Sequence, residues 1–135
     1  MTIPINSETL LPSIFKTTIE AFKNGAKSIA DNLLMNIIFE LKKNNTLYIN
    51  ALHEIEKNPK ITLELDTELF HDLMLNAEEQ IKKLLILIKK ENKKSEVYTE
   101  LQKITEELYK NMIIFSIEVS ATASELHHKE QKIAS

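Results

Sequence analysis

The 135-residue sequence contains one glycine, Gly25, and three prolines. Glycine and proline are the residues that most often form tight turns, and a fold built from many short strands needs such turns at short intervals. Leu, Ile, Lys, Glu and Asn dominate the sequence instead. This composition favours long, uninterrupted helices, so the sequence predicts an all-α fold.

Apolar residues recur with the helical period of 3.6 over most of the chain, and the length suits a single domain of residues 1–135. We therefore predict an antiparallel helical bundle of about four helices, one short and N-terminal and three long. The predicted helices span residues 12–24, 26–57, 67–92 and 95–129. Pro12 suits a first helical position, and Asp66 and Ser95 are the expected N-caps of the last two helices.

Two places along the chain are less regular. Asn44 and Asn45 fall near the apolar stripe of the predicted helix 26–57, where they either fix the register of a continuous helix or mark a local kink. The segment KITLEL, residues 60–65, is expected to be a loop or an extended segment. The last helix is expected to fray after Lys129.

The stretch NMIIFSIEVSATAS, residues 111–124, is apolar on two faces of its predicted helix. Met112, Phe115 and Val119 continue the core stripe, while other apolar residues point to the opposite side at about 100° per residue. A helix that is apolar all round is a buried helix, so something is expected to cover the second face. Weaker second faces occur on the two preceding helices. The predicted interface residues are Ile113, Ile114, Ile117, Ala121, Ile86, Leu75, Met35 and Phe39.

Two explanations for the second face are open and compatible. The short helix 12–24 could fold back onto the helix 95–129 and complete the bundle. Alternatively, the face binds another protein or a second copy of the chain. The short helix has about three turns and one apolar stripe, so it is too small to cover the second faces of all three long helices.

The composition argues against several classes of function. There is no cysteine, which excludes disulfides, thiolate metal sites and thiol nucleophiles. All 17 basic residues are lysine, so the planar fork that arginine offers to phosphate and guanine is missing. With a net charge of −3, nucleic-acid binding is not expected. A single glycine cannot build a phosphate-binding loop, and we expect neither an enzyme nor a bound cofactor.

One pattern favours metal chemistry. Glu68 with His71, and Glu125 with His128, repeat the Glu-x-x-His spacing and resemble the ligand motif of di-iron carboxylate bundles. On a helical wheel, however, Glu68 lies nearly opposite the core stripe, and both histidines point away from it. The sequence therefore predicts no metal site. The alternative is a metal site whose ligands are Glu68, His71, Glu125 and His128.

The N-terminus has no basic segment followed by an apolar run, and no stretch is long and apolar enough to span a membrane, so a cytoplasmic protein is expected. We predict a non-enzymatic protein–protein interaction module of the adaptor, inhibitor, immunity-protein or chaperone type. It is expected to bind through an apolar helix face and to self-associate. The alternatives are a metal-binding or redox bundle, and a bundle that binds an apolar small molecule or lipid between its helices.

Overall fold

The computed structural model describes residues 16–20, 31–91 and 95–134, and within these ranges the chain is helical with no strand. The described elements are α3 (Asp31–Lys57), the 3-10 helix η1 (Pro59–Glu64), α4 (Thr67–Glu91) and α5 (Glu96–Ala134). The prediction of an all-α helical bundle is confirmed.

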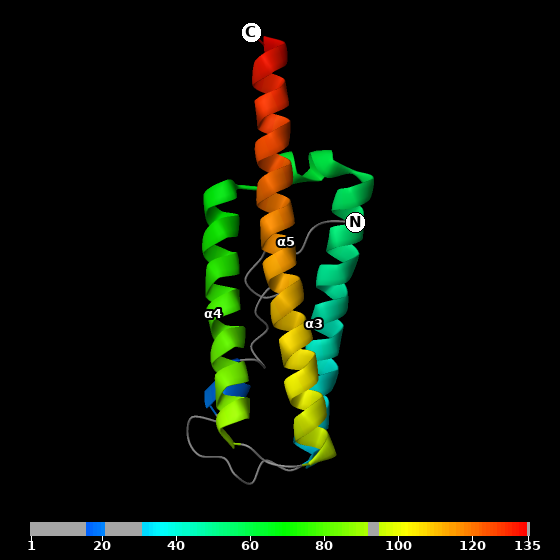
Figure 1. Ribbon diagram of the computed structural model, residues 1–135, viewed down its shortest axis with the longest axis vertical. Coiled ribbons are helices and arrows are strands. Elements are labelled where there is room, and N and C mark those ends of the chain that lie inside the picture. The colour runs from blue at the N-terminus through cyan, green and yellow to red at the C-terminus, as the bar shows by residue number, and fades with distance from the viewer. Residues whose placement is uncertain (1–15, 21–30, 92–94, 135) are drawn as a thin grey trace.

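The three long helices run up, down and up, so that each is antiparallel to the one before it (Figure 1). The α5 helix packs on α3, on α4 and on η1, and η1 also packs on α3. Polar side-chain contacts join α5 to both neighbours. For example, Asn45 of α3 is hydrogen-bonded to Asn111 of α5, and Lys89 of α4 forms an ion pair with Glu106 of α5. The α5 helix is therefore the element that holds the other two together.

For the first three predicted helices, the observed bounds agree with the predicted ones wherever the predicted helices lie within the described residues. The helix expected at 12–24 lies mostly outside the described residues, although 16–20 are helical and Thr18 and Ile19 are buried. For the predicted helix 26–57, the described part begins at Asp31 and ends at Lys57. The predicted helix 67–92 corresponds to Thr67–Glu91, and residue 92 lies outside the described ranges.

The end of α5 differs from the expectation. Instead of fraying after Lys129, the helix continues to Ala134. With 39 residues against the 27 of α3, it is about 18 Å longer at about 1.5 Å per residue. Figure 1 shows its C-terminal end projecting beyond η1 and beyond the ends of the other long helices. The last turns of α5 therefore have no described helix beside them.

Asn44 and Asn45 do not break their helix, since α3 is continuous across both. Both side chains are buried. The amide nitrogen Nδ2 of Asn111 donates a hydrogen bond to Oδ1 of Asn45 over 2.7 Å. A polar contact of this kind between two helices has one preferred alignment, which supports the register-fixing alternative over the kink.

The segment after α3 was wrongly expected to be a loop or extended, because Pro59–Glu64 forms the 3-10 helix η1. Proline at the start of a helical turn has a suitable fixed φ and needs no hydrogen-bond acceptor for its nitrogen. The hydroxyl of Thr62 then donates to the carbonyl of Pro59 over 2.8 Å. This local hydrogen bond, with Thr62 buried against the bundle, explains a compact turn where the alternating pattern of KITLEL favoured an extended one.

Side-chain caps begin the last two helices, as predicted. Oδ1 of Asp66 accepts a hydrogen bond from the backbone N–H of Leu69 over 3.1 Å. Oγ of Ser95 accepts one from the N–H of Tyr98 over 3.2 Å. Each cap satisfies one of the N–H groups that a helix start leaves without a partner inside the helix.

The core contains one apolar stripe from each long helix. Its fully buried large side chains are Tyr48, Phe115, Leu34, Leu41, Met74, Ile81, Leu84, Leu101, Leu108 and Met112. No helix within the described ranges has the length and apolar character needed to cross a membrane.

Candidate functional site

The stretch 111–124 lies in the middle of α5 and is divided between the core and solvent. Met112, Phe115 and Val119 are buried. The side chains of Ile114 and Ile117 remain 37% and 60% exposed on the other side of the helix. This is the division that a period of 3.6 residues imposes on a helix packed against neighbours along one side.

We call Ile114, Ile117 and Ala121 the α5 outer face. All three are exposed and lie within about 60° of one another on the helix. Ser120 and Ser124 beside them are small and exposed, so a second helix could approach closely. Ile113, also predicted to belong to the interface, is half-buried at the edge of this face.

The opposite side of the same stretch is anchored by aromatic contacts. The Phe115 ring meets Tyr48 of α3 edge-on, with ring centroids 5.3 Å apart, and Phe70 of α4 in the same way at 5.7 Å. These contacts join all three long helices at one point. They fix the rotation of α5 about its axis, and so determine which residues form the α5 outer face.

The other predicted interface residues are also exposed. Met35 and Phe39 lie on α3, and Leu75 and Ile86 lie on α4. Three further exposed apolar residues were not predicted from the sequence: Leu47, Ile49 and Leu69. Leu47 and Ile49 flank the buried Tyr48, and Leu69 precedes the buried Phe70. A step of one residue turns a side chain by about 100° away from the core stripe, and this signal could have identified them.

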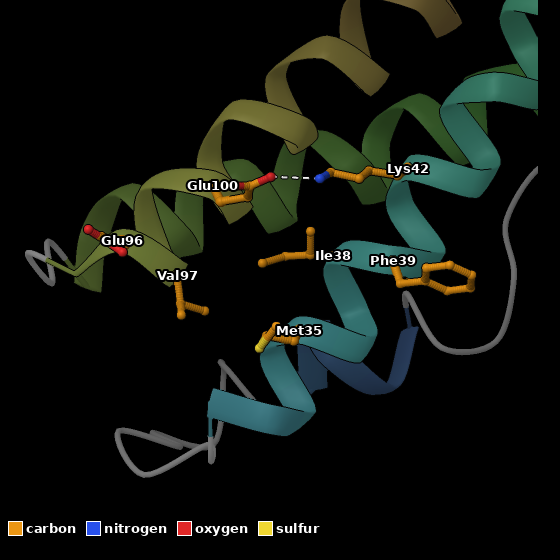
Figure 2. Close-up of a pocket in the computed structure, with 7 residues that line it drawn as sticks. All are labelled: Met35, Ile38, Phe39, Lys42, Glu96, Val97 and Glu100. Carbon is orange, nitrogen blue, oxygen red and sulfur yellow. Dashed lines mark hydrogen bonds and ion pairs between the residues drawn. The ribbon is translucent and has the colours of Figure 1, made fainter.

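A groove lies between the first turns of α3 and α5 (Figure 2). Its volume is about 400 Å³, and it is lined by Met35, Ile38, Phe39, Lys42, Glu96, Val97 and Glu100. Nζ of Lys42 and Oε1 of Glu100 form an ion pair over 2.6 Å across it. This hydrogen bond and the positive charge of Lys42 hold the pKa of the Glu100 carboxyl below its usual range. Both groups are exposed, so the pair adds little to stability.

The four residues of the alternative metal site are not gathered into a ligand cluster. Within the described part of the chain, no group of three or more histidine, aspartate or glutamate side chains lies close enough to hold a metal ion. Glu68 and His71 are exposed in the first turns of α4, and Glu125 and His128 are exposed on α5. The carboxylate of Glu125 instead forms an ion pair with Lys129 one turn later, at 3.3 Å.

Among the titratable groups of α4, Glu78 has a pKa that is clearly shifted by its environment. Its side chain is half-buried, and burial raises the pKa of its carboxyl, although the nearby His71 partly opposes this. Burial also raises the pKa of the Tyr48 phenol far above its usual range, and the Glu78 carboxylate raises it further. Tyr48 therefore stays protonated and keeps its place in the aromatic contacts at all ordinary pH values.

Glu78→Gln is expected to raise the midpoint of thermal unfolding at pH 7. Because the folded state raises the pKa of Glu78, its contribution to stability is fully present below the pKa of the unfolded chain and is lost as pH rises through the folded-state pKa. Glutamine stays neutral and avoids this loss. The gain over the wild type should disappear when melting is measured near pH 3. The matched control is Glu79→Gln at the exposed neighbouring residue, and an equal gain in both variants would contradict the role of burial.

Comparison of the chain with protein-family models, with curated proteins and with solved structures finds no match.

Proposed function

We propose that this chain is a non-enzymatic protein–protein interaction module that binds its partner through the α5 outer face. The observation that carries the proposal is the exposure of Ile117, which is 60%, in the middle of the longest helix. Full burial of a large aliphatic side chain contributes about 1.5–3 kcal/mol, so a partner that covers Ile117 would gain about 1–2 kcal/mol from this residue alone.

The surroundings of the α5 outer face support binding of another helix. The small side chains of Ser120, Ala121 and Ser124 leave room beside the two isoleucines. An amphipathic helix that docks in this way places apolar residues at intervals of three and four along its own length. Behind the face, Phe115 packs against Tyr48 and Phe70, so the face is already formed before a partner binds.

This function is compatible with an adaptor, an inhibitor, an immunity protein or a chaperone, and the cytoplasmic location stays a prediction from the sequence. Binding of an apolar small molecule also stays a prediction. The groove beside Met35 and Val97 is where such a ligand would bind, and its volume of about 400 Å³ lies within the range of ligand pockets.

The test is the double variant Ile114→Glu/Ile117→Glu. The variant is expected to keep its helical circular dichroism and to lose about 1.5–3 kcal/mol of stability, because Ile114 is 37% exposed and Ile117 is 60% exposed, so each is partly buried in the folded chain. Its association with other protein chains should be lost. Binding is measured by comparing the proteins retained from a cell extract by immobilised wild type and variant, together with the mass of each chain in solution.

A matched control is Leu47→Glu/Leu69→Glu, which places two carboxylates on exposed apolar positions outside the α5 outer face. This control should bind as the wild type does. Equal binding by Ile114→Glu/Ile117→Glu and the wild type would show that the α5 outer face is not the binding surface. Unfolding of that variant would show that the two isoleucines belong to the core.

A further inference from the structure

One side of α4 carries a basic surface with a large apolar residue at its centre. The side chain of Ile86 is 55% exposed. Lys82, Lys83, Lys89 and Lys90, all exposed, lie three or four residues before or after it. Residues at these spacings are neighbours on a helix surface, so the four lysines surround the isoleucine. We call these five residues the α4 basic face.

We propose that the α4 basic face binds an acidic segment of a partner protein. In this interaction, carboxylates of the segment meet the lysines, and a large apolar side chain between those carboxylates covers Ile86. The surface lies on a different helix from the α5 outer face, so the inference goes beyond the proposed function. The position of the lysines, the availability of their charges and the apolar centre carry it.

The helix dipole accounts for only two of these lysines. Lys89 and Lys90 lie in the last turn of α4, where positive side chains stabilise the carbonyl groups at the helix end. Lys82 and Lys83 lie nine and eight residues before the last residue, Glu91, and the effect of the dipole is confined to the last turn. The stability of the helix end therefore does not require them.

The charges of the lysines are available to a partner. Within the described residues, Lys89 is the only one of the four that forms an ion pair, and its Nζ lies 3.5 Å from Oε1 of Glu106 on α5. The two side chains of this pair are 53% and 46% exposed, so the pair is weak and can be exchanged for another. The other three ammonium groups have no carboxylate partner to displace.

Carboxylates beside the face reduce its positive charge only in part. Glu79 is exposed one turn before Lys82. Glu91 points about 140° away from Ile86 around the helix, at about 100° per residue. Four lysines set against Glu79 and Glu106 leave a surplus of two positive charges, which attracts an acidic segment.

A lipid surface and a nucleic acid fit this face less well than a protein does. Helices that lie on membranes bury a broad apolar face with aromatic residues, whereas here one isoleucine is set among charges and Glu79 lies beside it. Nucleic-acid binding uses arginine, which the chain lacks, and aromatic side chains on which bases stack, which the α4 basic face lacks. A protein segment supplies carboxylates and an apolar side chain together.

The experiment titrates the ¹⁵N-labelled chain at low salt with a synthetic peptide, EEAALAAEE, whose ends are acetylated and amidated. Its glutamates lie three and four residues to each side of one leucine. Amide signals of residues 82–90 should shift most, with a dissociation constant of about 0.1–1 mM, because exposed ion pairs are individually weak. The same peptide with serine in place of leucine should bind about fivefold more weakly, because the exposed half of Ile86 then stays uncovered.

Two variants separate the charges from the apolar centre. Lys82→Glu/Lys83→Glu should weaken binding of the leucine peptide about tenfold or more, since attraction becomes repulsion at two positions. The matched control is Lys43→Glu/Lys57→Glu, which makes the same change of net charge at exposed positions of α3 and should bind as the wild type does. Ile86→Ser keeps every lysine and should remove the difference between the two peptides. Thermal melting of each variant checks that the chain stays folded.

Several results would overturn the proposal. These are no binding at millimolar peptide, shifts centred outside residues 82–90, equal affinity for the leucine and serine peptides, or equal loss in Lys82→Glu/Lys83→Glu and its control. Vesicles of phosphatidylcholine and phosphatidylserine and a single-stranded oligothymidylate are titrated in parallel. Tighter binding of either one at residues 82–90 would assign the α4 basic face to a membrane or to a nucleic acid instead. None of these results bears on the α5 outer face, which Ile114→Glu/Ile117→Glu tests separately.

Discussion

Phe115→Ala is expected to lower the free energy of unfolding by about 3–5 kcal/mol, which is the range for truncating a buried aromatic side chain. The Phe115 side chain has 0% exposure. Its ring contacts Tyr48 and Phe70 edge-on, and no other ring pair in the described residues links α5 to the other two long helices. Alanine would lose the buried area and both ring contacts, and it would leave a cavity where three helices meet.

The free energy of unfolding of a typical domain is about 5–15 kcal/mol, so such a loss is a large part of it. Urea unfolding followed by circular dichroism measures it, provided that the slope of free energy against urea is unchanged between variants. The matched control is Phe39→Ala, since Phe39 is 65% exposed and the same truncation there should change stability by no more than about 0.5 kcal/mol. Similar losses in the two variants would contradict the central position of Phe115.

The sequence was sufficient to predict the helices because short-range physics determines them. The side chains of Asp66 and Ser95 cap helix starts within one turn of themselves, and both caps are present. The apolar stripes of the long helices repeat at the helical period, and this repeat identified Phe115 as a core residue two positions before the exposed Ile117. Such predictions depend on neighbours three or four residues away.

Features that depend on distant contacts were not predictable in the same way. The KITLEL segment has the alternation of a strand, but a proline at the start of η1 and the buried Thr62 favour a helical turn against the bundle. The groove between α3 and α5 depends on how far apart the first turns of these helices pack, which a helical wheel does not contain. The sequence predicted that the last helix is the longest, but not that it continues to Ala134.

The candidate site was predictable in part. A wheel places Ile114 and Ile117 opposite the core, but it cannot say whether another segment of the chain covers them. Within the described residues, no segment covers the two side chains fully, because they are 37% and 60% exposed. The exposure of Glu68 and His128 could be predicted from a helical wheel alone. Their outward direction follows from their spacing to the core stripe and does not depend on tertiary packing.

The second large effect concerns the hydrogen bond between α3 and α5. Asn45→Ala is expected to lower the free energy of unfolding by about 1–3 kcal/mol, because Nδ2 of the half-buried Asn111 loses the acceptor that it reaches over 2.7 Å. Asn111→Ala should cost a similar amount, because Oδ1 of Asn45 is then left without this donor and the Asn45 side chain is only 7% exposed. The penalty in each case arises from the polar group that stays behind.

A double-mutant cycle distinguishes this hydrogen bond from a mere loss of packing. If the two amides depend on each other, the double variant Asn45→Ala/Asn111→Ala should lose less than the two single losses together, by at least about 0.5 kcal/mol. Urea unfolding of the four proteins gives this coupling energy. Asn45→Leu/Asn111→Leu should be close to the wild type in stability, since an apolar pair leaves no unpaired polar group. If the single losses simply add, the two helices are not held by this contact, and the alignment of α3 with α5 would have to come from the apolar stripe and from Phe115.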